Sequence, residues 1–110
     1  HTLVVPARHV VQLTDLPVDA VGPFFERVRL IAAALPRALD RPGTFVAMNN
    51  IVSQSVAHLH VHVVPRRRGD GLRGFFWPRQ QYGDGEAADV AGRIRDALSA
   101  SSARDDRSDR

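Results

Sequence analysis

The segment Val56–Pro65 constrains the fold more than any other part of the chain. Histidines alternate there with aliphatic residues, at positions His58, Leu59, His60, Val61, His62 and Val63. In an extended strand successive side chains point to opposite faces, so the imidazoles would share one face and the aliphatic side chains the other. The β-branched content and the proline at the end predict a β-strand whose apolar face covers a core.

The rest of the sequence predicts two more strands and two helices. Residues 1–5 and 44–48 are short runs rich in β-branched residues, which predict strands. Apolar residues recur every three or four positions from Val18 to Leu35, which predicts a long helix with one buried face. A repeat of period four predicts a second helix from Glu86 to about Leu98. We therefore expect an α+β fold, in which an antiparallel β-sheet carries the long helix and a C-terminal helix follows.

Length and composition indicate one small domain. The chain has 110 residues, of which 44% are hydrophobic, and this is enough for a single core. We assign residues 1–99 to the domain and expect residues 100–110, rich in Ser, Arg and Asp, to form a disordered tail. The sequence has neither an apolar run of about 18 residues nor a signal-peptide pattern, so we expect a soluble, cytoplasmic protein with no membrane partner. The absence of cysteine excludes a disulfide, a thiolate nucleophile and a thiolate metal site within these residues.

The basic residues say little about a partner. All 15 are arginine, and they give a net charge of +3. A chain without lysine that is rich in Ala, Val and Asp is typical of a GC-rich genome, so the charge does not predict a nucleic-acid partner. The arginines that follow the histidines either contact distal phosphates of a long substrate or form a solvated loop. These residues are Arg66, Arg67, Arg68 and Arg73.

Three histidines on one face favour two kinds of chemistry. They could bind a zinc or iron ion, or a neutral imidazole could act as a nucleophile near neutral pH. Amide and hydroxyl side chains precede the histidines, and they suit the oxygen atoms of a phosphate group; they are Asn49, Asn50, Gln54 and Ser55. A metal site would favour a carboxylate, and none lies between Asp40 and Asp70. The residues therefore favour nucleophilic catalysis and no metal site.

The segment from Gln54 to Arg66 resembles the signature of the histidine-triad (HIT) family, in which His alternates with hydrophobic residues and a Gln stands four positions before the first His. A second block, His1–Val10 with Leu13–Leu16, resembles the strand and turn that precede the long helix of that family. Asn49 and Asn50 resemble the asparagine that ends the following strand. The resemblance covers roughly residues 1–77, with each block in the expected order.

The resemblance implies a mechanism. The middle histidine of the triad, here His60, attacks the α-phosphorus of a nucleotide and forms a covalent nucleotidyl-histidine intermediate that water releases. His58 orients the His60 ring through its backbone carbonyl, and His62 stabilises charge on the phosphoryl oxygens. The residues implied to position those oxygens are Gln54, Ser55, Asn49 and Asn50. No cofactor is required for this step.

The resemblance also has gaps. The first strand or strands of the family pattern, which contact the ribose, are absent, so we expect a chain that lacks its first segment. Some members bind zinc with two cysteines from that segment and histidines like His9 and His58; a structural zinc here would require cysteines from a longer parent chain. The loop Ile51–Ser53 is shorter than usual and lacks the usual glycines. Family members pair with a second copy, which implies a homodimer.

These observations leave several functions open. The leading hypothesis is an enzyme that hydrolyses or transfers nucleotides from a dinucleoside polyphosphate, an adenosine phosphoramidate or a related compound. The alternatives are a phosphorylase, in which inorganic phosphate accepts the nucleotide, a non-catalytic nucleotide-binding module, and a metal-dependent enzyme that uses the histidines as ligands.

Overall fold

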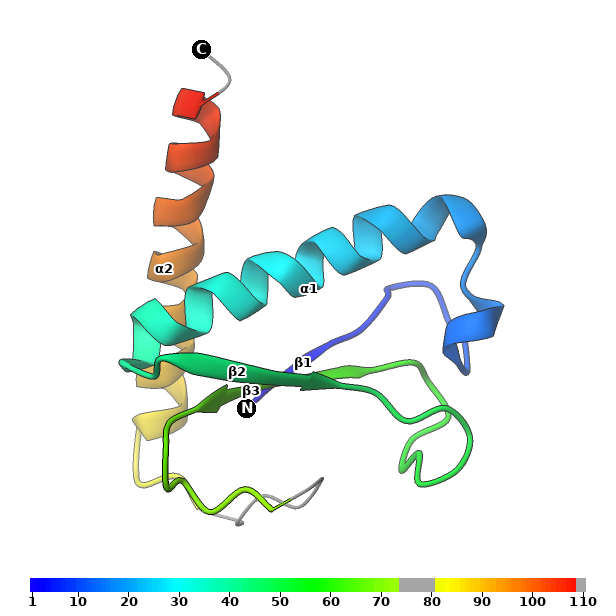
Figure 1. The fold of residues 1–110 in the computed structure, drawn as a ribbon, viewed down its shortest axis with the longest axis horizontal. Helices are drawn as coiled ribbons and strands as arrows, with labels where there is room; N and C mark the ends of the chain where they lie inside the picture. The colour runs from blue at the N-terminus through cyan, green and yellow to red at the C-terminus, as the bar shows by residue number, and fades with distance from the viewer. Residues whose placement is uncertain (74–80, 109–110) are drawn as a thin grey trace.

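The computed structural model describes residues 1–73 and 81–108, with side chains described up to residue 100. The elements in chain order are β1 (Thr2–Val4), the 3-10 helix η1 (Leu13–Asp15), α1 (Val18–Leu39), β2 (Gly43–Ala47), β3 (Val61–Arg66) and α2 (Glu86–Ser108). The strands form an antiparallel sheet in the order β1-β3-β2, and α1 lies along one face of it (Figure 1). The predicted α+β fold is confirmed.

The long helix α1 supplies one layer of the core. Its buried residues are Phe24, Val28, Ala34, Leu35 and Ala38. The helix does not end at Leu35 as the sequence predicted, but continues through Pro36 to Leu39. Burial of Ala38 on the same face offsets the hydrogen bond that the proline cannot donate. The helix ends where Asp40 adopts the left-handed backbone conformation, with a φ of 51°.

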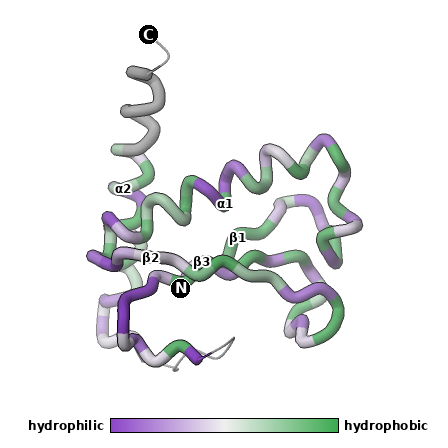
Figure 2. Tube along the Cα trace, in the orientation of Figure 1, coloured by the Kyte–Doolittle hydropathy of each residue, from purple (hydrophilic) through white to green (hydrophobic). Residues whose placement is uncertain are grey.

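The core lies between α1 and the central strand. Leu35 of α1 is fully buried in the same cluster as Val61 and Val63 of β3 and Leu59, which precedes that strand. Ile94 of α2 packs against the same cluster. Figure 2 shows hydrophobic residues where β1 lies beside β3 beneath α1. Full burial of one large aliphatic side chain stabilises the fold by about 1.5–3 kcal/mol, so this small set contributes much of the stability.

The central strand β3 is shorter than the sequence predicted. It begins at Val61 rather than Val56, and residues 55–60 are bent or irregular. The register gives the reason, because Val61 is paired with Val4, the last residue of β1, and His62 with Ala47, the last residue of β2. A strand needs a neighbour to pair with along its length, and both neighbours leave the sheet at this point.

The second helix α2 starts at Glu86 as predicted but runs to Ser108, past Leu98, where the apolar repeat ends. Residues 100–108, which the sequence assigned to a disordered tail, are thus helical, and this stretch contains no Gly or Pro that would interrupt a helix. Figure 1 shows α2 crossing the end of α1 and extending beyond the sheet. Within the part of the chain that the structure describes, neither helix combines the length and the apolar character needed to cross a membrane.

Candidate active site

His60 lies directly before β3, and its ring is held in one orientation. The residue is 7% exposed. Its ring nitrogen Nδ1 lies 2.7 Å from the backbone carbonyl oxygen of His58. A carbonyl can accept but not donate, so Nδ1 carries the hydrogen and Nε2 of the neutral ring keeps its lone pair. The contact between the His58 carbonyl and the His60 ring is the one that the family resemblance implied.

The other nitrogen of His60 is at the accessible part of the ring. Within the described residues, Nε2 makes no hydrogen bond, and no buried side-chain nitrogen or oxygen lacks a partner. Nε2 is therefore not fully buried, although the residue as a whole is 7% exposed. The backbone contact thus fixes the ring with Nε2 as the nitrogen without the hydrogen, and this arrangement suits an imidazole nucleophile.

His62 packs against His60 and bonds to a histidine directly before the neighbouring strand β1. The His60 and His62 ring centroids are 5.1 Å apart, in an edge-to-face arrangement. Nδ1 of His62 lies 2.8 Å from Nε2 of His1, with the ring centroids 5.0 Å apart. Burial lowers the pKa of His62, and the nearby His60 lowers this pKa further. His62 is therefore neutral near pH 7 and can act as a hydrogen-bond partner without adding charge.

The sequence did not identify His1 as a site residue. The antiparallel register pairs Leu3 with His62, which places His1 and His62 on the same face of adjacent strands. Only the pairing of β1 with β3 brings the two imidazoles together. The sequence signal that could have found this contact is the alternation of His1 and Leu3 on a predicted strand, but that pattern does not specify a register.

His58 does not share a pocket with the other two triad histidines. The sequence predicted three rings on one face of a strand, able to converge on one ligand. Instead, Nε2 of His58 lies 2.9 Å from the Pro6 carbonyl oxygen, and Nδ1 lies 3.2 Å from Nδ1 of His9. The prediction of one converging row is wrong, because residues 55–60 bend where the predicted strand would need a neighbour.

The polar residues before the triad take different positions. Gln54 and Asn50 are engaged in holding the loop: the Gln54 side chain donates to the Val11 carbonyl and accepts from the Ile51 amide, while Asn50 Oδ1 accepts from the Leu13 amide at 2.8 Å. Asn49 and Ser55 are exposed, and neither side chain makes a hydrogen bond or ion pair within the described residues. Phosphate binding stays a prediction for all four residues, and the side chains that are free for it are those of Asn49 and Ser55.

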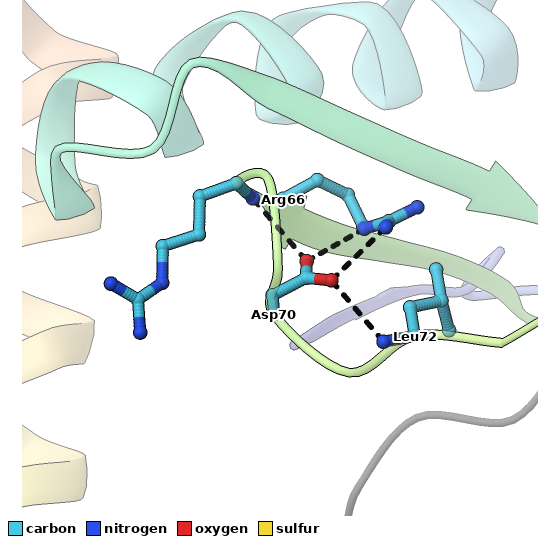
Figure 3. Close-up of polar contacts among 4 residues, drawn as sticks. Arg66, Asp70 and Leu72 are labelled. Carbon is cyan, nitrogen blue, oxygen red and sulfur yellow. Dashed lines mark hydrogen bonds and ion pairs between the residues drawn. The ribbon is translucent and has the colours of Figure 1, made fainter.

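The arginine loop is shaped by an ion pair. Asp70 accepts two hydrogen bonds from the Arg66 guanidinium, at 2.7 and 3.0 Å, and it also accepts the Arg67 and Leu72 amides (Figure 3). The Arg66 guanidinium holds the pKa of Asp70 well below its usual range. The Arg66 guanidinium is therefore engaged in holding the turn between Arg66 and Leu72. A surface groove of about 330 Å³ lies beside it, lined by Pro42, Gly43, Arg66, Arg67 and Arg68.

The described residues do not fit a metal site. Within residues 1–73 and 81–100, no group of three His, Cys, Asp or Glu side chains is arranged to hold a metal ion. His9 and His58 are the two imidazoles that the resemblance associates with zinc, and their Nδ1 atoms lie at hydrogen-bond distance from each other. Two ligands are fewer than the four of a structural zinc site. A structural zinc with cysteines from a longer chain stays a prediction.

Comparison with known proteins identifies the family. A HIT domain model matches residues 1–69. An uncharacterized HIT-like protein of Mycobacterium tuberculosis is 40% identical over 74 residues, which cover 66% of this chain and 51% of that protein. An adenosine 5'-monophosphoramidase of Saccharomyces cerevisiae is 33% identical over 85 residues, covering 74% of this chain and 50% of the relative. A bis(5'-nucleosyl)-tetraphosphatase of Schizosaccharomyces pombe is 31% identical over 72 residues, which cover 64% of this chain and 40% of that protein.

A solved structure agrees with these matches. A zinc-bound histidine triad family protein from Mycobacterium smegmatis has a TM-score of 0.72 and 32% identity, and the match covers 93% of this chain and 70% of that chain. The chain spans about half the length of the curated relatives it matches. Because the HIT domain model covers more than half of the sequence, including the sheet, α1 and the three histidines, this chain belongs to the HIT domain family.

Proposed function

We propose that this chain hydrolyses or transfers nucleotides by attacking the α-phosphate of a phosphoanhydride or phosphoramidate with Nε2 of His60. The observation that carries the proposal is the hydrogen bond from His60 Nδ1 to the His58 carbonyl, which leaves Nε2 with its lone pair. The ring pays no cost of reorientation in the reaction, because its tautomer and angle are set beforehand.

The proposed reaction has two displacement steps. In the first, the Nε2–phosphorus bond forms while the bond from the α-phosphorus to the leaving oxygen or nitrogen breaks, and the leaving group takes a proton. In the second, water attacks the same phosphorus and the Nε2–phosphorus bond breaks, which releases a nucleoside monophosphate and returns His60 to its neutral form. A transferase would use another acceptor in place of water. Dividing the reaction at a covalent intermediate lowers each barrier separately.

In this proposal His62 stabilises the phosphoryl group, and its position beside His60 supports that role. Its ring lies 5.1 Å from that of His60, so an oxygen on the attacked phosphorus falls within its reach. The lowered pKa of His62 keeps the ring neutral, and its bond to His1 holds one of its nitrogens. The exposed side chains of Asn49 and Ser55 are the candidates for further contacts to phosphoryl oxygens.

The names of two relatives support the choice of substrate class. Their names include an adenosine 5'-monophosphoramidase and a bis(5'-nucleosyl)-tetraphosphatase. An adenosine phosphoramidate is the smaller of the two and needs no site for a second nucleoside. We therefore take it as the first substrate to test and a dinucleoside polyphosphate as the second.

A dimer, which would extend the site with a second copy, is part of the proposal, and size-exclusion chromatography with light scattering tests it.

The decisive experiment traps the intermediate. The protein is mixed with adenosine 5'-phosphoramidate, quenched under conditions that preserve phosphoramidates, and analysed by mass spectrometry. We expect an adenylyl adduct on His60 and a loss of turnover in His60→Ala of about 10³-fold or more. Val18→Ala, which changes a 91% exposed side chain, is the folded control and should keep full activity. Unchanged turnover in His60→Ala would exclude catalysis by this residue.

Two alternatives give different results in the same assay. A phosphorylase would form a nucleoside diphosphate from a dinucleoside polyphosphate only when inorganic phosphate is added. A non-catalytic nucleotide-binding module would bind adenosine monophosphate but give neither product nor adduct. Sensitivity to a chelator, together with metal analysis, separates both from a metal-dependent enzyme.

A further inference from the structure

A surface groove lies at the end of the sheet where β2 begins and β3 ends. It has a volume of about 330 Å³ and is lined by Pro42, Gly43, Arg66, Arg67 and Arg68, and we call it the arginine groove. The register pairs Gly43 with Arg66, so the groove lies against the last residue pair of these two strands. A methyl group at Gly43 would lie 3.8 Å from Cβ of Arg66, an ordinary contact, so packing does not require a glycine here. The volume is within the range of small-molecule sites, about 300–1,000 Å³.

The three arginines of the groove have different roles. The Arg66 guanidinium donates to Asp70, which also accepts the Arg67 and Leu72 amides, so these contacts fix the shape of the turn (Figure 3). The side chains of Arg67 and Arg68 are exposed, and neither makes a hydrogen bond or an ion pair within the described residues. A guanidinium presents its N–H groups in a fixed fork that matches two oxygens of a phosphate. The groove therefore combines an open space with two guanidinium groups that are available to an anion.

Arg66 and the proposed active site share one face of the sheet. Val61 and Val63 of β3 are buried in the core beneath α1. Because side chains alternate along a strand, His62 and Arg66 lie on the opposite face. Four residues along β3 separate these two positions, a distance of about 13 Å at the rise of a strand. The His62 ring lies beside that of His60, so a phosphate chain that starts at the nucleophile and follows β3 reaches the groove after several phosphates.

We infer that the arginine groove is a subsite for the distal phosphates of a dinucleoside polyphosphate whose α-phosphate lies at His60. Arg67 and Arg68 bind these phosphates through charge-assisted hydrogen bonds, and the ion pair of Arg66 with Asp70 holds the turn that carries them. The positive charge also offsets the charge that the leaving group gains when its bond to the α-phosphorus breaks. This inference rests on the proposed function for its catalytic consequence, and it makes the chain selective for a polyphosphate over a phosphoramidate, which has no distal phosphates.

A solvated basic loop is the alternative explanation of these arginines. Such a loop would attract any anion from a distance, and its effect would depend on net charge rather than on which arginine is removed. The subsite makes a narrower prediction, because only a ligand long enough to reach the groove gains from Arg67 and Arg68. Filling the groove without removing a charge should also weaken binding of that ligand, and Gly43 allows this test.

Two variants separate the charge of the groove from its shape. Arg67→Gln combined with Arg68→Gln removes both available charges and keeps polar side chains at these positions. Gly43→Val keeps every charge and fills the groove, and a β-branched residue suits a strand. The matched control, called the helix control, combines Arg27→Gln with Arg95→Gln and removes two charges from exposed positions on α1 and α2. Thermal unfolding followed by circular dichroism checks that each protein folds.

The main readout is steady-state kinetics with diadenosine tetraphosphate and with adenosine 5'-phosphoramidate. For the double arginine variant we expect kcat/KM to fall about tenfold with the tetraphosphate, the size expected from lost charge-assisted contacts at an exposed site, and less than about twofold with the phosphoramidate. Gly43→Val should show the same selective loss, and the helix control should match the original protein. Added NaCl should lower kcat/KM for the tetraphosphate more steeply in the original protein than in the double variant, since salt screens exposed charges.

A binding measurement makes the test independent of turnover. Isothermal titration calorimetry uses inorganic tripolyphosphate as the probe, and we expect the double arginine variant to bind it about tenfold more weakly than the helix control does. If no protein turns over either substrate but this difference is found, the subsite stands and the proposed function fails. Equal binding of tripolyphosphate by the two proteins would contradict the subsite.

Three kinetic results would also overturn the inference. The first is a double arginine variant that keeps the original kcat/KM with the tetraphosphate, or loses it equally with both substrates. The second is an equal loss in the double variant and the helix control, which would assign the effect to net charge. The third is unchanged kinetics together with weaker binding of a single-stranded RNA, measured by fluorescence anisotropy, since the groove would then bind a nucleic acid.

Discussion

The two halves of the histidine segment are held in place by different kinds of contact. Residues 61–66 form β3, which is paired with β1 on one side and β2 on the other through regular backbone hydrogen bonds. Residues 55–60 have no such pairing and are held by single contacts, including the Leu59 amide to Val10, the His58 ring to Pro6, and the buried Leu59 side chain. His60 is the last residue of the irregular segment and directly precedes the paired strand.

This difference separates the functions of the two histidines at the site. His62 belongs to the regular strand, so its position is fixed by the register that pairs it with Leu3 and Ala47. The ring of His60 is oriented by the carbonyl of the irregular segment, so substitutions there can change the nucleophile without disturbing the sheet. The ring of the proposed nucleophile is thus oriented by residues outside the sheet, where a substitution does not remove strand pairing.

The largest expected effect tests whether the irregular segment is as firmly packed as the strand. Leu59 is fully buried, so Leu59→Ala should lower the free energy of unfolding by about 2–5 kcal/mol, measured by urea denaturation. Val56→Ala, in the same segment but 60% exposed, should change it by less than about 0.5 kcal/mol. A cost below about 1 kcal/mol for Leu59→Ala would mean that the segment packs loosely.

A smaller effect distinguishes the two neighbouring asparagines. Asn50→Ala removes the acceptor for the Leu13 amide and should lower the free energy of unfolding by about 1 kcal/mol. Asn49→Ala should leave stability unchanged, because its side chain is exposed and makes no contact in the described chain. If Asn49 contacts the phosphate as proposed, its loss raises KM in the phosphoramidate assay. Equal stability costs for the two variants would contradict the different positions of these side chains.

The backbone of the loop before the triad offers a stabilising change. Ser53 has a φ of 62°, in the left-handed region that costs a residue with a side chain about 1–2 kcal/mol. Ser53→Gly removes this cost but adds flexibility to the unfolded chain, so we expect a net gain of about 0.5 kcal/mol in thermal unfolding. Ser55→Gly, at a position without a positive φ, should be slightly destabilising. A loss of stability in Ser53→Gly would argue against the strained conformation.

The smallest expected effect is a dependence of stability on pH that comes from the regular half. Burial and His60 lower the pKa of His62 in the folded protein, so the unfolded state binds a proton more readily. Above the unfolded pKa of about 6.5 both states are neutral and this term is absent. As pH falls below that value the free energy of unfolding decreases. His62→Asn should flatten this part of the profile between pH 7 and 5, and an unchanged profile would assign it to other groups.

The sequence predicted the layers of the fold better than the geometry of the site. The spacing from Val18 to Leu35 was sufficient to predict α1, and the alternation at residues 61–65 predicted β3, because both patterns reflect a single buried face. The same alternation failed at residues 56–60, where no neighbouring strand is available. Convergence of the three imidazoles failed for the same reason, and the contacts of His58 with His9 and His62 with His1 join segments far apart in the chain.

By itself the sequence determined that α1 and β3 form and which of their faces are buried, since periodicity is a local property. The choice of His60 as nucleophile came from the family resemblance and stays a prediction. The tertiary structure decided where β3 begins, which imidazoles meet, and which nitrogen of His60 is free. These depend on strand register and on the cross-chain contacts of residues 6–10, and a local pattern does not contain either.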